Sequence, residues 1–142
     1  MPFRRLPLLD RLVQAPSPLI KETLSRTLIV AVQHLLETTG SLFETLLRLG
    51  LRPENTFILG KAYSSNSSVA RRLRAVGLAV HEGSLPKRPG AFQDVFRADV
   101  EELWGRALKG LRDTGCTDIV ILDDGGRCIS MVPEEVHRLA RV

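Results

Sequence analysis

The sequence contains no apolar run that approaches the ~20 residues of a membrane-spanning helix. Near the N-terminus, Arg4 and Arg5 are followed by apolar residues, but Asp10 and Gln14 interrupt this stretch. A cleaved signal peptide needs an unbroken apolar segment at that place. We therefore predict neither a membrane anchor nor a secretory leader.

Cysteine is scarce: Cys116 and Cys128 are the only two in 142 residues. Two cysteines do not make a disulfide framework, and these two lack the spacing of metal ligands. A reduced, cytoplasmic setting is the default for such a chain. We expect no disulfide and no metal site.

Aromatic residues make up only 5% of the chain, and 20 basic residues barely exceed 16 acidic ones, for a formal charge of +4. The basic clusters are scattered and are not interleaved with aromatic residues, which is typical of solvated faces rather than of a nucleic-acid surface. Nucleic acid is therefore not an expected partner. The clusters are Arg4-Arg5, Arg71-Arg72-Arg74 and Lys87-Arg88, the last in a predicted surface loop at 87–90.

What the chain does have is a hydrophobic content of 44% and a charged content of 25%, typical of a soluble globular protein with one sizeable core. Apolar segments alternate with helical patterns, which predicts a Rossmann-like α/β fold: a doubly wound sheet of about four parallel strands with flanking helices. We expect a helical arm at 1–26 and a single α/β domain at 27–142. The predicted strands are 27–32, 56–59, 78–80 and 118–122, and the predicted helices after the arm are 42–49, 67–76, 93–112 and 134–141.

The segment 118–122 is predicted to be a strand buried on both faces and to lie beside strand 27–32. Asp123, Asp124, Gly125 and Gly126 follow it directly, at the end of a strand where parallel sheets place their ligands. Neighbouring side chains on an extended segment point in opposite directions, so one aspartate can face a ligand while the other serves the loop. A simple Asx turn without a ligand is the alternative.

The other strands also end in polar residues, at 33–34, 63–66 and 81–82. Because all carboxyl ends of a parallel sheet lie on one edge, a crevice there would collect several of these groups. They suit a neutral polar ligand with hydroxyls and ring nitrogens, such as a nucleoside. Thr39 or Ser41 is the expected N-cap of the helix at 42–49, with anion binding at the helix start as the alternative to simple capping.

Several motifs resemble the S-adenosylhomocysteine hydrolases. The segment 121–126 reads Ile-Leu-Asp-Asp-Gly-Gly, as that family's motif does. The stretch from His34 to Gly50 is similar to the family's histidine-led loop and following helix, and Tyr63-Ser64-Ser65-Asn66 is similar to its Phe-Ser-Thr-Gln. Ala75-Val76-Gly77 followed by Val80 resembles the turn into its third strand. The resemblance covers roughly 27–130 and concerns only the family's N-terminal, substrate-binding half.

In that family, adenosine is held against NAD in a separate domain, and the reaction oxidises the ribose 3′-hydroxyl before homocysteine is eliminated or added. Three places depart from the pattern. Leu36 stands in place of a threonine, and Arg127 stands in place of an aspartate. The family's Glu-Thr pair falls on Thr38-Thr39 without a gap, or on Glu37-Thr38 with one. The resemblance therefore implies an adenosine- or S-adenosylhomocysteine-type ligand in a pocket that has changed. The implied substrate-binding residues are His34, Thr38, Thr39, Ser64, Ser65, Asn66, Asp123 and Asp124.

The sequence has no Gly-x-Gly-x-x-Gly fingerprint, so we expect no NAD or other cofactor site in this chain. The family's catalytic glutamate, lysine–aspartate pair and further histidine come after the matched region. We therefore expect no turnover of S-adenosylhomocysteine by this chain alone and assign no catalytic residue.

Four hypotheses stay open: a nucleoside-binding, hydrolase-like protein; a fragment of a longer hydrolase-like enzyme; a non-catalytic module that acts as a homo-oligomer or with a companion chain; and a phosphoribosyltransferase-like protein. The last class also has an apolar strand that runs into Asp-Asp. It needs a Thr-Gly-Gly-Thr-like loop for the 5′-phosphate, and the segment 125–130 is not such a loop.

Overall fold

Four strands form one sheet in the computed structural model, which describes residues 3–85 and 92–139. The strands β1 (Thr27–Gln33), β2 (Thr56–Gly60), β3 (Ala79–Val80) and β4 (Asp118–Asp123) are all parallel, in the order β3-β2-β1-β4. Thr27 is in register with Asp118, and Val32 with Asp123. The α/β doubly wound fold is therefore confirmed, as is the pairing of the first and last strands. The direction of strand order reverses between β1 and β4, which makes this the switch point of the sheet.

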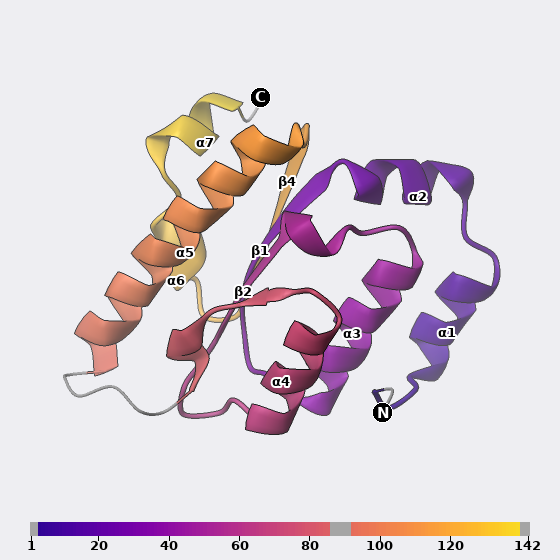
Figure 1. Cartoon of the computed structure of the whole chain (residues 1–142), viewed down its shortest axis with the longest axis horizontal. Helices are drawn as coiled ribbons and strands as arrows, with labels where there is room; N and C mark the ends of the chain where they lie inside the picture. Colours follow the sequence, from indigo (N-terminus) through magenta and orange to yellow (C-terminus); the bar gives the residue numbers. More distant parts are fainter. Residues whose placement is uncertain (1–2, 86–91, 140–142) are drawn as a thin grey trace.

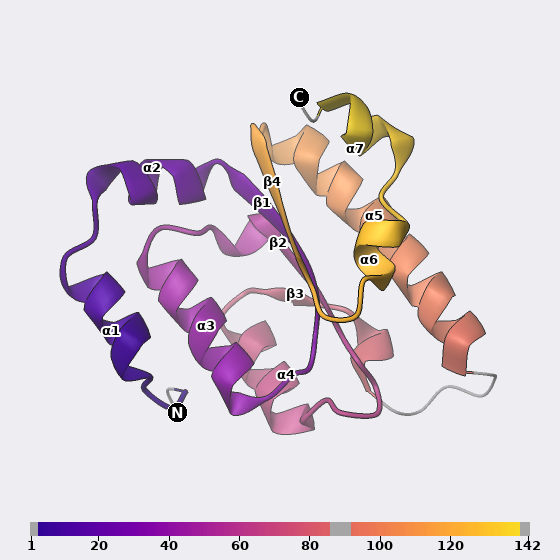
Figure 2. The same ribbon diagram turned by 180° about the vertical axis from the view of Figure 1, so that it is seen from behind.

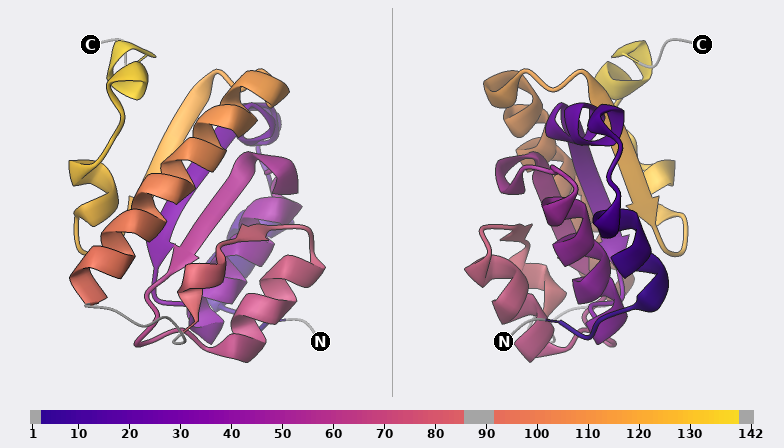
Figure 3. Two further views of the ribbon diagram at one scale, coloured as in Figure 1. Left: turned by 60° about the vertical axis from the view of Figure 1, so that its left-hand side comes forward. Right: turned by 90° about the vertical axis from the view of Figure 1, so that its right-hand side faces the viewer.

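Helices cover both faces of the sheet (Figure 1). On one face lie α3 (Glu37–Arg48) and α4 (Ser67–Ala75), and on the other lies the long α5 (Phe92–Thr114) (Figure 3). The residues of β1 alternate between the two cores, as the period of two in a strand requires. Those toward α3 and α4 are Ile29 and Ala31, and those toward α5 are Leu28, Val30 and Val32.

The prediction that the last strand is buried on both faces is wrong. β4 is an edge strand of the described sheet, and Val120 is 42% exposed. The two fully buried strands in the middle are β1, apart from its last residue, and β2. An apolar run shows that a strand packs against something, but it does not tell a central strand from an edge strand that is covered mainly on one face.

Helix α3 begins at Glu37, so the predicted loop before residue 42 and the predicted caps at Thr39 and Ser41 are also wrong. Leu36 holds the N-cap position and makes no side-chain cap bond. Gly40 stands inside the first turns because the ring of Phe3 packs on it, and a Cβ there would lie 2.2 Å from that ring. Tertiary packing thus overrides the local breaker signal of the glycine.

The N-terminal arm consists of two short helices, as predicted: α1 (Pro7–Gln14) contacts α3, and α2 (Pro18–Ser25) contacts β1 (Figure 2). Phe3 anchors the arm, since its ring is buried and the guanidinium carbon of Arg72 lies 3.7 Å from the ring centroid. Within the described residues, no helix has both the length and the apolar character that a membrane crossing requires.

Four short helices complete the described elements: η1 (Pro53–Asn55), η2 (Glu82–Ser84), α6 (Arg127–Ser130) and α7 (Glu134–Leu139). Of these, α7 was predicted from the sequence, whereas η1, η2 and α6 were not. The predicted surface loop at 87–90 and the predicted end of the last helix at 140–141 lie outside the described residues.

Candidate ligand site at the carboxyl ends of β1 and β4

The ends of β1 and β4 are fastened to each other by hydrogen bonds. The Asp124 amide donates to the Val32 carbonyl at 2.9 Å, which continues the parallel ladder one residue past β4. The Gln33 side-chain amide donates to the Leu122 carbonyl at 3.1 Å. These two bonds place Asp124 directly beside the residue that follows β1, His34.

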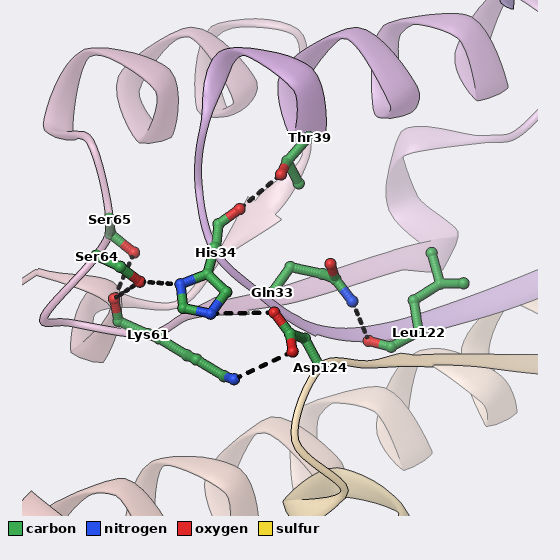
Figure 4. Close-up of polar contacts among 8 residues, drawn as sticks. All are labelled: Gln33, His34, Thr39, Lys61, Ser64, Ser65, Leu122 and Asp124. Atoms are coloured by element: carbon green, nitrogen blue, oxygen red, sulfur yellow. Dashed lines mark hydrogen bonds and ion pairs between the residues drawn. The ribbon is translucent and has the colours of Figure 1, made fainter.

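The imidazole of His34 lies between a hydroxyl and a carboxylate (Figure 4). Its Nδ1 is hydrogen-bonded to Ser64 Oγ, and its Nε2 lies 3.0 Å from Asp124 Oδ2. The main chain of His34 is fixed as well, because Thr39 Oγ1 donates to its carbonyl at 2.6 Å. The ring therefore has contacts on both sides, while 31% of the side chain stays exposed.

Lys61 approaches the same carboxylate from the loop after β2. Its Nζ lies 3.5 Å from Asp124 Oδ1, so each oxygen of Asp124 faces a different basic side chain. The lysine side chain is only 10% exposed, whereas that of Asp124 is 47% exposed. Burial of an ammonium group is costly unless it is paired, and Asp124 supplies the pairing. The result is a carboxylate held in place from two sides and open to solvent on its remaining side.

An open pocket of about 200 Å³ lies against this carboxylate. Besides Lys61 and Asp124, its lining comes from the residues after β4 and from the first turns of α5. Aromatic rings form one wall: Tyr63 meets Phe92 edge-on at 5.4 Å between centroids, and Phe92 stacks on Phe96 at 5.4 Å. The other lining residues are Gln93, Gly125 and Arg127.

The neighbouring Asp123 is used differently from Asp124. Its Oδ2 accepts the Ile129 amide at 2.9 Å, which fixes the start of α6, and it does not line the pocket. Behind it, burial raises the pKa of Cys128 to about 12, and the negative charge of Asp123 adds to the shift. The two adjacent aspartates thus have separate tasks, one in the loop and one at the pocket.

The remaining predicted site residues divide into two groups. Ser64 belongs to the cluster through His34, and Ser65 Oγ donates to the Lys61 carbonyl at 3.0 Å, which shapes the loop behind the lysine. Thr38 is exposed on α3, and Asn66 is the N-cap of α4, where it accepts from the Ser68 amide at 2.8 Å. Thr38 and Asn66 are therefore not brought to the pocket.

Sequence reasoning missed Lys61 and Gln93 as site residues. Lys61 follows β2 directly, just as His34 follows β1, and this shared position was the signal that could have found it. Gln93 lies at the start of α5, which crosses the far face of the sheet, and no local pattern connects it with β4.

A Ser64–His34–Asp124 series resembles the relay of a serine hydrolase. Such chemistry also needs amide donors aimed at a developing oxyanion. The amide of Ser64 donates to the Lys61 carbonyl at 2.9 Å, and that of Asn66 donates to the Leu35 carbonyl at 3.0 Å. Neither of these two amides is free to stabilise an oxyanion.

A second histidine lies at the end of β3. His81 Nε2 is 3.1 Å from Glu102 Oε2, without the angle of a hydrogen bond, and Nδ1 is 4.0 Å from Asp99 Oδ1. These three side chains have the spacing of a metal site. However, Nδ1 accepts the Gly83 amide at 3.0 Å, which leaves the ring proton on Nε2, and a protonated nitrogen does not bind a metal ion. We therefore interpret this cluster as structural.

Comparisons with known proteins add relatives but no activity. No protein-family model matches the chain, and no solved structure matches it significantly. Two uncharacterized proteins of Mycobacterium tuberculosis, from strains CDC 1551 / Oshkosh and ATCC 25618 / H37Rv, are each 30% identical to it over 131 residues. The match covers 92% of this chain and 25% of each relative, so the chain spans about a quarter of their length.

Proposed function

We propose that the chain binds a nucleoside-type ligand, of the adenosine or S-adenosylhomocysteine kind, through the ribose hydroxyls at the ends of β1 and β4. The observation that carries this proposal is the half-exposed carboxylate of Asp124, which contacts His34 and Lys61 and lines the pocket. The likeness of segment 121–126 to the S-adenosylhomocysteine hydrolase motif supports the same choice of ligand.

The chemistry of a ribose fits this carboxylate. An ionised carboxylate is an acceptor only, with about four lone-pair sites, so it can receive two vicinal hydroxyls while it keeps its contacts to His34 and Lys61. Such charge-assisted bonds are stronger than those between neutral groups. Because Asp124 is held by its two neighbours before any ligand arrives, little conformational freedom is lost on binding.

The described residues do not fit NAD. A dinucleotide needs glycines in the turn after the first strand, so that the pyrophosphate can approach the helix start. Here that turn holds His34, Leu35 and Leu36, of which only Leu35 is fully buried. The nearest glycine, Gly40, is covered by the ring of Phe3. We therefore propose a binding function without NAD-dependent turnover by this chain alone. The same binding function would serve equally as the substrate-binding part of a longer hydrolase-like protein.

Calorimetric titration of adenosine and of S-adenosylhomocysteine tests the proposal. The Asp124→Asn variant should bind more weakly than wild type by about 1.5–3 kcal/mol, because it loses the charge-assisted bonds. The matched control is Asp118→Asn, at the opposite end of the same strand, where the exposed side chain accepts from Thr117 Oγ1 at 2.8 Å. Its affinity should equal that of wild type.

Two results would contradict the proposal. One is that neither ligand binds wild type at millimolar concentration. The other is that Asp124→Asn binds both ligands as tightly as wild type does. Turnover of S-adenosylhomocysteine by the purified chain, with or without added NAD, would contradict the binding-only part.

A non-catalytic interaction module is the second candidate function. It is favoured by exposed apolar residues on the edge strand β4 and on the N-terminal helices α1 and α2. Val120 is exposed on β4, and Leu8 and Leu19 are exposed on α1 and α2. We would expect self-association through the free edge of β4, because unpaired edge strands readily pair. Sedimentation velocity over a concentration series would show a dimer that Val120→Lys abolishes; a monomer at all concentrations would contradict this candidate.

A further inference from the structure

The pocket beside Asp124 has more positive than negative charge in its lining. Two basic side chains, Lys61 and Arg127, face one acidic side chain, Asp124, so the lining has a net formal charge of +1. Lys61 lies 3.5 Å from the carboxylate. Arg127 has no carboxylate within ion-pair distance among the residues that the structure describes, and its Nη2 donates only to the neutral amide oxygen of Gln93, at 3.1 Å.

The backbone between these side chains leaves space beside the ammonium group. Gly125 has φ +106°, a conformation that side-chain-bearing residues rarely adopt, and a Cβ built there would lie 3.1 Å from Lys61 Nζ. Lys61 is one of the few buried charged residues, at 8% exposure, and its ammonium group reaches the pocket lining. A ligand group can therefore meet the ammonium group of a lysine whose side chain is mostly buried.

The aromatic wall of Tyr63, Phe92 and Phe96 makes charge in this pocket more effective. Apolar rings next to a cation lower the local dielectric constant, which strengthens its attraction for an anion. Of the three rings, Phe96 is buried, while Tyr63 and Phe92 keep exposed surface at the rim. A neutral nucleoside would leave the excess positive charge of the pocket lining without an anionic partner.

We propose that the ligand of this pocket is a nucleoside that carries a phosphate group, which Lys61 and Arg127 bind. This deepens the proposed function and rests on it. If Asp124 receives the 2′- and 3′-hydroxyls of the ribose, the 5′ position is left for the phosphate. A phosphate monoester brings a charge of about −1.5 to −2 and three strong acceptor oxygens, which match one ammonium and one guanidinium group.

Calorimetry with four probes tests this inference: adenosine, adenosine 5′-monophosphate, ribose 5-phosphate and inorganic phosphate. Wild type should bind adenosine 5′-monophosphate about tenfold or more tightly than adenosine, since charge-assisted bonds to phosphate add to those of the ribose. In Arg127→Gln the ratio of these two affinities should fall severalfold. The control, Arg138→Gln on α7, removes another exposed positive charge that does not line the pocket, and it should leave both affinities unchanged. Circular dichroism of each variant shows whether it is folded.

The possible results separate this inference from the function on which it rests. Two results would overturn the proposed phosphate contacts and leave the nucleoside-binding proposal in place. One is that wild type binds adenosine and its monophosphate with equal affinity. The other is that folded Arg127→Gln keeps the wild-type ratio of these two affinities. If inorganic phosphate binds as tightly as the nucleotide and adenosine does not bind, both the phosphate inference and the nucleoside-binding proposal are overturned. Ribose 5-phosphate that binds as tightly as the nucleotide would show that the base contributes nothing, and the ligand would then not be a nucleotide.

Discussion

Two strand ends of the same sheet combine a histidine with acidic residues, and they differ in almost every physical respect. At the end of β1, the side chains of His34 and Asp124 are 31% and 47% exposed, and they line or adjoin an open pocket. At the end of β3, the side chain of His81 faces that of Asp99 on α5, and both are only 3% exposed. The residue types alone do not distinguish the two ends.

The difference lies in what each histidine contacts. Both nitrogens of His34 face side-chain groups, Ser64 and Asp124, that a ligand hydroxyl could replace or join. The Nδ1 of His81 instead accepts a backbone amide, that of Gly83, which ties the ring into the η2 turn. A buried polar group tied to the backbone stabilises the fold, whereas a half-exposed one with side-chain partners is available for binding.

The largest expected effect is a difference in stability between the two histidine variants. His81→Ala should lower the free energy of unfolding by about 2–4 kcal/mol, because it leaves a cavity and an unpaired backbone amide at Gly83. His34→Ala should cost no more than about 1 kcal/mol, since water can solvate the groups that it exposes. Urea denaturation measures both, and equal losses would remove the distinction drawn between the two ends.

Substitutions at two separate glycines, Gly83 in η2 and Gly105 in α5, test the packing at the β3 end. A Cβ on Gly83 would lie 2.2 Å from Asp99 Oδ2, so Gly83→Ala should destabilise the protein by about 1–3 kcal/mol through overpacking. The matched control is Gly105→Ala in α5, where a Cβ meets nothing within 4 Å. That change should stabilise by up to about 1 kcal/mol, because alanine favours a helix interior over glycine. Thermal unfolding of both variants, monitored by circular dichroism, shows whether each substitution raises or lowers the stability.

The sequence predicted the fold more completely than the site. Periodicity and strand–helix alternation predicted the four strands of the described sheet and the helices α3, α4, α5 and α7, because each of these signals is local. They did not predict the short helices η1, η2 and α6. Local patterns could not show that α3 starts at Glu37, since the first turn depends on the contact of Gly40 with Phe3. They could not place β4 at an edge either, since strand order is set by long-range packing.

In the site, the resemblance named His34 and Asp124, and the structure places these two side chains in contact. It also included Asn66 and Thr38, of which the first is a helix cap and the second an exposed helix residue. Lys61 was missed because a lysine after a strand reads as an ordinary solvated residue. Only the tertiary structure shows that this lysine is buried.

A smaller effect is expected at Asp123, the aspartate at the same strand end that does not line the pocket. Asp123→Ala removes the acceptor of the Ile129 amide and should lower the free energy of unfolding by about 1 kcal/mol. Chemical denaturation measures this value, with Asp118→Ala at the start of β4 as the control. A loss of 3 kcal/mol or more would mean that Asp123 holds more of the structure than the start of α6.

The smallest effect concerns the two thiols near the ends of β4. Cys128 is buried and its pKa is raised to about 12, so in the native protein it should react with a thiol reagent far more slowly than the partly exposed Cys116. The unfolded state ionises the Cys128 thiol near pH 9 and the folded state does not, so this group destabilises the fold as pH rises from about 9 toward 12. Mass spectrometry of labelled peptides at pH 8 gives the order of reaction, and faster labelling of Cys128 would contradict its burial.

The pairing of β1 with β4 also has a consequence for how the protein is made. Thr27 and Asp118 are partners although 90 residues separate them along the chain, so this contact closes the longest loop of the sheet. Loop closure of that length is slow compared with the formation of local helices. During synthesis, β1, β2 and β3 are all made before β4 exists. His34 therefore waits for its carboxylate partner until the final strand docks, and a chain that stops after α5 would have no Asp124 at all. The candidate site is in this sense completed only when the last strand of the sheet is in place.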